Sequence, residues 1–357
     1  MSHEPSSLNA RSHLAACRTI DAAANRAAEG LRVVEDFVRF GLDDRHLTAI
    51  AKNIRHDLTA ALRHFSTEVL HTARDTQADV GVDVSTQAER TRSDLTQLAT
   101  SNLKRAQQSL RTLEEFSKLS QPQVSPSFEQ LRYRCYTLEK AISTTQTNAL
   151  QFADYRLYVL IDGAADPEQF AQLIAELVAG GVDLLQLRDK TLDDRTLLAR
   201  ARQLRQSTAQ TSTLAIINDR PDIAALADAD GVHVGQEELP VKEARSIVGS
   251  GKLVGVSTHS IEQARRAVLD GADYLGVGPT FPSQTKSFDH FPGLKLVAQV
   301  ADEIRLPAFA IGGITLQNVD QVMQAGLSRV AISRAIACAA DPCRAAQTMR
   351  QRLTDRA

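Results

Sequence analysis

Between residues 155 and 334 the chain repeats one pattern eight times: a short run of β-branched or leucine residues, a polar or glycine-rich loop, and an amphipathic stretch. Eight such strand–helix units in about 200 residues predict a closed (β/α)8 TIM barrel of the α/β class. An open, doubly wound sheet is the alternative, but the strand count and the phosphate-type loops favour closure. The apolar runs are 155–162, 183–189, 214–219, 231–234, 253–257, 274–279, 308–314 and 329–334.

The residues ahead of this pattern are of another kind. Only three of the 18 glycines precede residue 150, and this segment is rich in Ala, Leu, Arg and Glu, with apolar residues at helical spacing. Such a composition predicts an all-α domain. The polar run 143–148 has weak helix propensity and no apolar period, so we place the boundary there, with a helical domain at 1–148 and the barrel at 149–357.

The helical segment contains an internal repeat, because residues 24–40 reappear as residues 103–119. Segment 53–56 likewise parallels 130–133. Two related helical hairpins that pack as a pseudo-symmetric bundle account for this pattern. The repeated Arg and Glu are three residues apart on one helix, so the simplest interpretation is a salt bridge on the bundle surface. The identical pairs are Arg26/Arg105, Ala27/Ala106, Leu31/Leu110, Arg32/Arg111, Glu35/Glu114 and Phe37/Phe116.

Composition excludes several kinds of protein. With 41 basic against 43 acidic residues and a net charge of -2, the chain lacks the basic excess that nucleic-acid binding needs. No apolar run reaches the length of a membrane span and no signal-type apolar region is present, so we expect a cytoplasmic protein without a membrane anchor. The cysteines form no C-x-x-C pair and fit free thiols in a reducing compartment; they are Cys17, Cys135, Cys338 and Cys343.

Polar residues of the predicted barrel gather at the ends of its strands, where TIM barrels build their active sites. Gln186, Arg188 and Lys190 alternate at the end of the second run, which predicts that their side chains share one face. Two cations at a barrel mouth indicate an anionic ligand, because desolvation would otherwise go uncompensated. The alternative is ion pairing with the acidic residues of segment 189–194.

Asp219 ends the third run and Glu238 follows the fourth, so neighbouring strand ends bring two carboxylates beside the basic cluster. This combination indicates Mg²⁺, which binds one or two carboxylates together with phosphate oxygens and water. The alternative for Asp219 alone is a cap on the following helix. His233 lies inside the fourth run, where a hydrogen-bonded core histidine is the usual case, and we assign it no catalytic role.

The loops after the last three runs indicate a second anion site. Segment 278–286, GPTFPSQTK, carries hydroxyls and the Lys286 ammonium on a loop that could close on an anionic group. Gly312 and Gly313 allow a ligand to approach the backbone closely, and Ser333 starts a predicted helix. We therefore expect one cationic, metal-assisted site for a diphosphate and one backbone-built site for a monophosphate.

The segments QLRDK, IIND, GVHVGQEELP, GVSTHS, GVGPTFPSQTK, AIGGIT and AISRAI occur in this order, and together they resemble the thiamine-phosphate synthase family over residues 154–345. The resemblance implies a transferase that joins hydroxymethylpyrimidine diphosphate to hydroxyethylthiazole phosphate, or to its carboxylated form. It also implies that diphosphate leaves first and that the thiazole nitrogen captures the pyrimidine cation, so catalysis is electrostatic and positional. A thiazole tautomerase of the same superfamily is the alternative, although it would not need the diphosphate-binding residues.

The same resemblance implies roles for individual residues. Two positions depart from the family pattern: Glu238 stands where Asp is common, which alters the ligand geometry, and Ser283 stands where Thr is preferred. The pyrimidine diphosphate would be bound by Gln186, Arg188, Lys190, Asn218, Ser257 and Lys286, the thiazole phosphate by Ser283, Gln284, Thr285, Gly313, Ile332 and Ser333, and Mg²⁺ by Asp219 and Glu238. Ser283, Gln284, Thr285 and Lys286 would also contact the diphosphate.

The helical half resembles, through DAAANRAAEGLRVVEDFVRF, IRHDL and RDTQADVG, a domain fused ahead of some thiamine-phosphate synthases and associated with hydroxymethylpyrimidine-phosphate kinase activity. This implies ATP as a co-substrate, although no ordinary ATP motif is present. The alternative is a non-catalytic module that oligomerises or docks a partner. We expect small phosphorylated substrates and neither nucleic acid nor membrane as partners, and a homo-oligomer stays open. Candidate residues with phosphate-capable side chains are Asn25, Arg26, Glu29, Arg32, Arg55, His56, Arg74, Asp79, Arg105 and Arg111.

Overall fold

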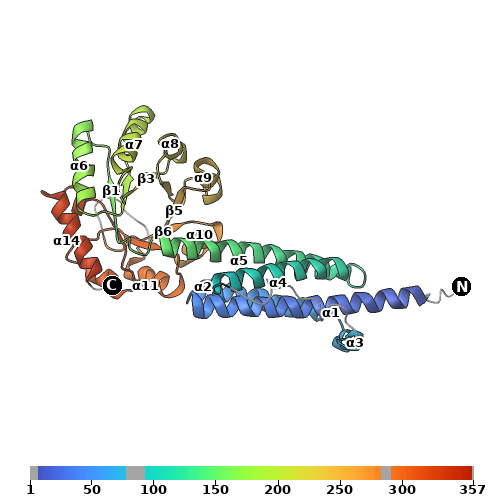
Figure 1. Ribbon diagram of the computed structural model, residues 1–357. Helices are drawn as coiled ribbons and strands as arrows, with labels where there is room; N and C mark the ends of the chain where they lie inside the picture. The colour runs from blue at the N-terminus through green and yellow to red at the C-terminus, as the bar shows by residue number, and fades with distance from the viewer. Residues whose placement is uncertain (1–6, 78–92, 283–290, 356–357) are drawn as a thin grey trace. The chain divides into compact units, whose positions relative to one another are not determined.

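The computed structural model describes residues 7–77, 93–282 and 291–355 (Figure 1). The chain separates into two compact units between Ile142 and Ser143. The first unit is helical, as its composition predicted. It contains α1 (Ser7–Asp36), a π-helical turn η1 (Phe37–Gly41), α2 (Arg45–Leu62), α3 (Thr67–Ala73), α4 (Leu95–Ser117), a 3-10 turn η3 (Pro122–Val124) and most of α5 (Ser125–Gln151).

The internal repeat forms the core of the helical unit. Helices α1 and α4 contain most of its two copies and pack against each other. Ala27 and Leu31 on α1 and their equivalents Ala106 and Leu110 on α4 are all fully buried. Gly30 allows the close packing, because a Cβ at this position would lie 2.7 Å from the main-chain oxygen of Asn102.

The polar run 143–148 is helical as part of α5, although its own helix propensity is weak. Contacts within the second unit stabilise it there. Asn148 is buried, and its Nδ2 donates a hydrogen bond to Asp273 Oδ1 at 3.1 Å. Just beyond the helix, Phe152 is fully buried, with its ring centroid 5.6 Å from that of Tyr274 in the barrel core. The end of α5 therefore belongs to the floor of the barrel.

The second unit is a closed barrel in which all neighbouring strands are parallel and β8 pairs with β1. This confirms the predicted TIM barrel and excludes the open sheet. The strands are β1 (Leu157–Ile161), β2 (Leu184–Leu187), β3 (Leu214–Asn218), β4 (Gly231–Val234), β5 (Leu253–Thr258), β6 (Tyr274–Val277), β7 (Ala308–Ile311) and β8 (Val330–Ile332). The helices are α6 (Pro167–Ala179), α7 (Asp194–Thr208), α8 (Pro221–Leu226), α9 (Val241–Val248), α10 (Ile261–Asp270), α11 (Gly293–Glu303), α12 (Val319–Gln324), α13 (Arg334–Ala337) and α14 (Pro342–Thr354).

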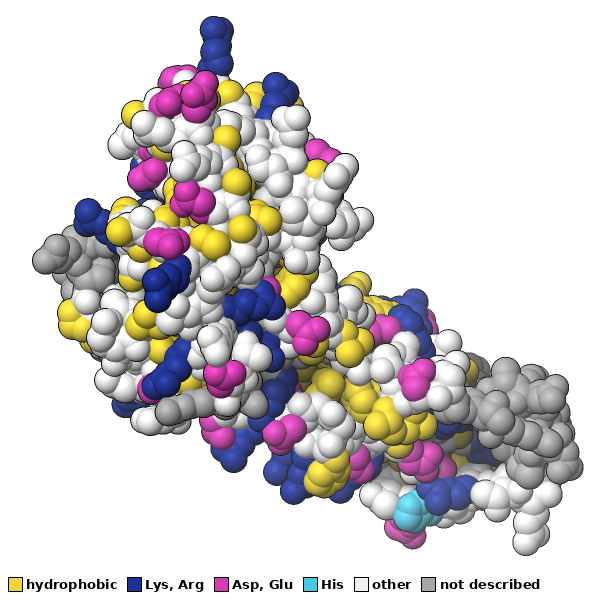
Figure 2. All heavy atoms as spheres, turned by 60° about the vertical axis from the view of Figure 1, so that its left-hand side comes forward, with side chains coloured by type: hydrophobic (Ala, Val, Ile, Leu, Met, Phe, Trp, Pro, Cys, Tyr) yellow, Lys and Arg dark blue, Asp and Glu magenta, His cyan; other side chains and the backbone are white. Residues whose placement is uncertain are grey.

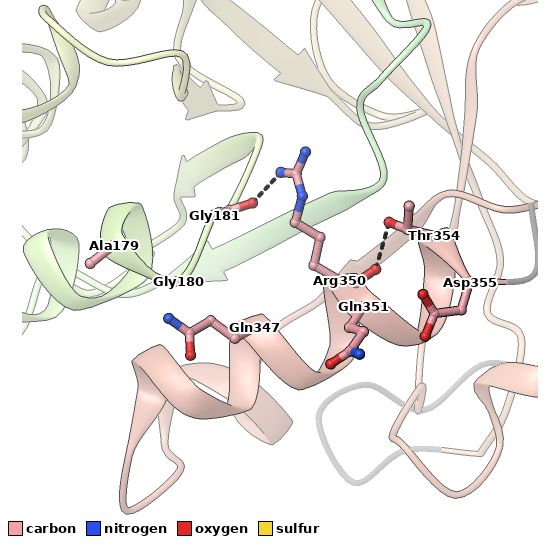
Figure 3. A pocket seen from close by; sticks show the side chains of 8 residues that line it. All are labelled: Ala179, Gly180, Gly181, Gln347, Arg350, Gln351, Thr354 and Asp355. Atoms are coloured by element: carbon pink, nitrogen blue, oxygen red, sulfur yellow. Dashed lines mark hydrogen bonds between the residues drawn. The ribbon is translucent and has the colours of Figure 1, made fainter.

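At the amino end of the barrel, an aspartate precedes each of β2, β4 and β6. Asp183, Asp230 and Asp273 accept hydrogen bonds of 2.9, 2.8 and 2.7 Å from main-chain amides near the start of β1, β3 and β5. Arg350 of α14 donates to Asp183 Oδ1 at 2.5 Å and to the Gly181 carbonyl (Figure 3). These contacts join strands and helices at the end opposite the predicted site. The pocket beside them is lined by Ala179, Gly180, Gly181, Gln347, Arg350, Gln351, Thr354 and Asp355.

Candidate active site

Three predicted residues from separate loops meet at the carboxyl end of the barrel. Lys190 Nζ lies 3.1 Å from Asp219 Oδ2 and 3.8 Å from Glu238 Oε1. Asp219 follows β3 with a φ of 59°, a left-handed conformation that Asp adopts more readily than most residues. The Glu238 carboxylate lies against Gly235, where Oε2 is 2.3 Å from the position that a Cβ of residue 235 would take. The backbone after β3 and β4 thus holds both carboxylates around one cation.

This arrangement fits Mg²⁺. Asp219 and Glu238 already share one positive charge, the ammonium of Lys190, and Mg²⁺ needs only one or two carboxylates when phosphate and water complete its shell. Among the described residues, no group of three or more His, Cys, Asp or Glu suited to a metal occurs. The capping alternative for Asp219 is wrong, because Arg220 is the N-cap residue of α8 and no side chain caps that helix.

The residues of the second run divide between two environments. Since β2 ends at Leu187, strand alternation governs Gln186 but not Arg188 or Lys190. Gln186 is 2 % exposed and hydrogen-bonded inside the barrel. Arg188 is half-buried in the loop, and its main-chain amide donates to Ile161 O at 2.8 Å. Lys190 is exposed above the two carboxylates.

The acidic residues of segment 189–194 have other partners than the two cations. Asp189 accepts from the amides of Gly163 and Thr191, Asp193 caps α7, and Asp194 lies 2.5 Å from Arg220. Arg188 forms no ion pair with any residue in the described part of the chain. Its guanidinium is therefore available to an anion at the mouth.

A buried hydrogen-bonded chain lies below the mouth and joins Gln186, Tyr158, Tyr274, His233 and Ser257. Burial lowers the pKa of His233 to about 4, against the opposing effect of the Asp219 charge, so the imidazole is neutral near pH 7. His233 is thus the hydrogen-bonded core histidine that the sequence predicted. The two tyrosines were missed, because a tyrosine in an apolar run resembles ordinary core; the available signal was that a buried tyrosine hydroxyl usually needs a hydrogen-bond partner.

The loops after β6 and β7 are joined where the second anion site was predicted. Thr280 N donates to Ile311 O at 2.8 Å, and Phe281 N donates to Gly312 O at 2.9 Å. Gly313 has a φ of 63°, and a Cβ there would lie 2.7 Å from Pro282 O. Both the conformation and the contact require glycine at this position. Four predicted ligands fall outside the described residues: Ser283, Gln284, Thr285 and Lys286.

The remaining predicted barrel residues lie at strand ends. Ile332 is buried as the last residue of β8, and Ser333 is exposed as the N-cap residue of α13. The predicted helix after Ser333 is present but has only four residues. Asn218 ends β3 and Ser257 lies near the end of β5, and both are half-buried.

In the helical unit, each copy of the repeat holds one buried glutamate between two arginines. This confirms the predicted ion pairs, but the carboxylates are only 4 and 5 % exposed, so they do not lie on the surface. Arg132 was not among the predicted residues, although the parallel between 53–56 and 130–133 makes it the equivalent of Arg55. Glu35 accepts from Arg55 Nε at 2.7 Å and lies 3.6 Å from Arg32, while Glu114 accepts from Arg132 Nε at 3.1 Å and from Arg111.

The other candidates of the helical unit fall into two groups. Arg74 donates two hydrogen bonds of 2.7 Å to the Asp21 carboxylate, and Asn25 donates to the Asp21 main-chain oxygen at 3.0 Å. Four of the predicted arginines therefore form ion pairs: Arg32, Arg55, Arg74 and Arg111. The second group is exposed and forms no ion pair with another described residue; its members are Arg26, Glu29, His56 and Arg105. Asp79 lies outside the described residues.

Three further observations concern residues outside these sites. Cys17 and Cys135 are buried free thiols, and burial raises the pKa of Cys135 to about 12. Acidic and basic side chains both occur on the face shown in Figure 2. Among the helices that the structure describes, none has the length and apolar character needed to cross a membrane.

Known proteins resemble the chain over both units. Residues 157–336 match the Thiamine monophosphate synthase family, and residues 18–141 match the ThiD2 family. A thiamine-phosphate synthase of Rhodopirellula baltica is 47% identical over 329 residues, which cover 90% of this chain and 88% of the relative. The chain belongs to the thiamine-phosphate synthase family. Another member, from Thermosynechococcus vestitus, is 40% identical over 339 residues, or 94% of this chain and 95% of the relative.

A solved structure agrees with this membership. The thiamine phosphate pyrophosphorylase from Pyrococcus furiosus superposes with a TM-score of 0.51 and 30% sequence identity, covering 58% of this chain and 98% of that chain. As a family member, the protein is a transferase of thiamine biosynthesis. The ThiD2 match over the helical unit is compatible with a kinase-like part.

Proposed function

We propose that the barrel transfers the pyrimidinylmethyl group of hydroxymethylpyrimidine diphosphate to the ring nitrogen of hydroxyethylthiazole phosphate. The products are thiamine phosphate and diphosphate, with loss of CO2 as well when the thiazole is carboxylated. The observation that supports this most is the meeting of Lys190 with Asp219 and Glu238. The loop after β2 next to them carries Arg188, which has no ion-pair partner among the residues that the structure describes. Cations and carboxylates so placed fit a diphosphate bound with Mg²⁺.

Departure of diphosphate is the step that these residues favour. The C–O bond to the methylene carbon breaks and its electron pair leaves with the diphosphate, where Arg188 and Lys190 stabilise the developing negative charge. Mg²⁺, when held by Asp219 and Glu238, would supply further charge compensation to the diphosphate. Gly313 and Ser333 would hold the thiazole phosphate so that its ring nitrogen faces the methylene carbon. Positioning then replaces a protein nucleophile.

Replacement of Arg188 tests this assignment. We expect Arg188→Ala to lower the rate of thiamine phosphate formation by about 100-fold or more, because charge stabilisation at the leaving group is lost. Lys286→Ala should have a similar effect. Arg202→Ala, on the exposed face of α7, is the control and should leave the rate unchanged. Near-normal coupling by folded Arg188→Ala would contradict the proposal, and thiazole isomerisation without coupling would favour the tautomerase alternative.

We propose further that the helical unit transfers the γ-phosphoryl group of ATP to hydroxymethylpyrimidine phosphate and so forms the diphosphate that the barrel consumes. The ThiD2 match over residues 18–141 and the exposed, repeat-related Arg26 and Arg105 support this reading. The four free thiols fit a reducing compartment, and we place both reactions in the cytoplasm.

The kinase proposal is tested on the full chain with its barrel blocked. Arg188→Ala protein, given ATP, Mg²⁺ and the pyrimidine monophosphate, should accumulate ADP and the pyrimidine diphosphate in equal amounts. Arg105→Ala in the same background should slow both products together. A folded protein that forms no ADP above its ATP-only blank would identify the helical unit as a non-catalytic module.

A further inference from the structure

The chain of buried polar groups below the mouth connects two residues assigned to the pyrimidine substrate. Gln186 Nε2 donates to the Tyr158 hydroxyl, which lies 3.1 Å from the Tyr274 hydroxyl. The Tyr274 hydroxyl lies 3.3 Å from His233 Nδ1, and His233 Nε2 lies 2.9 Å from Ser257 Oγ. Gln186 and Ser257 form the two ends, and the three residues between them are buried and out of reach of a ligand.

Two glycines on the neighbouring strands make space for this chain. Gly255 pairs in register with both His233 and Tyr274, and a Cβ there would lie within 2.5 Å of the Tyr274 hydroxyl. A Cβ at Gly276 would lie 3.3 Å from His233 Nε2. The strands thus leave the Tyr274 and His233 rings little freedom to move, so the barrel strands fix the positions of these two members of the hydrogen-bonded chain.

With the amide nitrogen of Gln186 facing the Tyr158 hydroxyl, as it does in the structure, one direction of donation gives every hydrogen of the hydrogen-bonded chain an acceptor. Because the Gln186 amide nitrogen donates and cannot accept, the Tyr158 hydroxyl must donate to Tyr274. The Tyr274 hydroxyl then has His233 Nδ1 as its acceptor. An imidazole that accepts a hydrogen bond at Nδ1 has its proton on Nε2, and this Nε2–H donates to Ser257 Oγ at 2.9 Å. The hydroxyl hydrogen of Ser257 therefore remains for an acceptor at the mouth.

At the other end, the amide orientation leaves Gln186 Oε1 without a hydrogen-bond partner among the residues that the structure describes. The mouth thus presents a donor at Ser257 and an acceptor at Gln186. An aminopyrimidine offers the complementary pair, since its ring nitrogens accept and its exocyclic amine donates.

We propose that Tyr158, Tyr274 and His233 are positioning residues that fix this donor and acceptor polarity, and thereby select the aminopyrimidine part of the substrate. The selection of this ligand rests on the coupling reaction proposed above, whereas the polarity of the chain does not. The two parts are therefore tested separately.

The polarity is tested by ¹⁵N NMR of the full-length protein labelled at histidine. We expect His233 to be the Nε2–H tautomer near pH 7, with its signals identified by their loss in His233→Gln. In Tyr274→Phe the donor to Nδ1 is absent, and a mixture of both tautomers should appear. An Nδ1–H tautomer in the wild-type protein would reverse the direction and overturn the proposal, whatever the enzyme's activity.

The selection is tested by steady-state kinetics of the full chain. Tyr158→Phe and Tyr274→Phe should each raise KM for the pyrimidine diphosphate about tenfold, the effect of one oriented hydrogen bond, and leave KM for the thiazole phosphate unchanged. Tyr155→Phe is the matched control, because Tyr155 packs against the same core but is not part of the hydrogen-bonded chain. Equal changes in both KM values, or none in folded variants, would overturn the proposal. Absence of coupling in the wild-type protein would instead contradict the proposed function.

Discussion

Lys190 is the cation that lies closest to both carboxylates at the mouth of the barrel. Its ammonium neutralises part of the charge of Asp219 and Glu238, and the same ammonium is proposed to stabilise the diphosphate. At the proposed site, Mg²⁺ would therefore compete with Lys190 for the carboxylates until a diphosphate offered Lys190 another partner. The sequence places these groups near one another, because all follow strands at one barrel end, but only the structure shows that they touch.

Removal of the Lys190 charge should strengthen binding of a divalent cation to the free enzyme. For Lys190→Met we expect the Kd for Mn²⁺, measured by electron paramagnetic resonance without diphosphate, to fall about tenfold, since one competing unit charge within about 4 Å is lost. Lys252→Met is the control, because Lys252 pairs with Asp228 at 2.5 Å, outside the mouth. Unchanged or weaker Mn²⁺ binding by Lys190→Met would contradict a shared cation position.

Among the elements, strands β5 and β6 contribute space as well as side chains. Gly255→Ala should destabilise the barrel by about 1–3 kcal/mol, because the new methyl group overlaps the Tyr274 ring. Gly251→Ala is the control and should cause no steric overlap, since no atom lies within 4 Å of the Cβ position of residue 251. Urea unfolding followed by circular dichroism measures both. Equal stability of the two variants would show that Tyr274 moves freely, contrary to the close fit described above.

Helices α1, α2, α4 and α5 are joined by their buried glutamates. Arg132→Leu should lower the free energy of unfolding by about 3 kcal/mol, because it leaves Glu114 buried with only the exposed Arg111 as partner. Arg134→Leu, two residues along α5, removes an exposed pair with Asp57 and should cost less than about 1 kcal/mol. Urea unfolding distinguishes them, and similar losses for both would contradict a special role for the buried pair.

The pKa of Glu35 makes the stabilisation by the Glu35–Arg55 ion pair depend on pH. Burial raises this pKa, but the hydrogen bond and charge of Arg55 outweigh burial, and the pKa is lowered overall. The stabilisation is therefore complete above the unfolded pKa of about 4.3 and is lost as the pH falls through the lower folded value. Between about pH 6 and 3, Glu35→Gln should lose less stability than the wild-type protein or Glu29→Gln. An identical acid profile for all three would rule out this contribution.

For the molecule as a whole, the barrel separates stability from catalysis along its axis. Asp230→Ala, at the amino end, should lower Tm but leave kcat unchanged at temperatures below the unfolding transition. The reason is that the Asp230 carboxylate only joins the start of one strand to the next. Asp219→Ala, at the other end, should abolish coupling with a much smaller change in Tm. A calorimetric scan and a coupling assay on each variant check this, and a loss of kcat in folded Asp230→Ala would contradict the separation.

The sequence by itself determined the two-part organisation, the eight strands and the loops that form the mouth, because apolar periodicity and strand-end chemistry are local properties of the chain. The repeat of residues 24–40 likewise predicted paired helices with equivalent cores. Tertiary structure decided three further points. Burial turned Glu35 and Glu114 from expected surface ions into internal ones. Contacts of Asn148 with the barrel kept a weak helix former helical. The register of β4, β5 and β6 placed Tyr274, His233 and Ser257 in one hydrogen-bonded chain, and such partners depend on strand pairing between residues far apart in sequence.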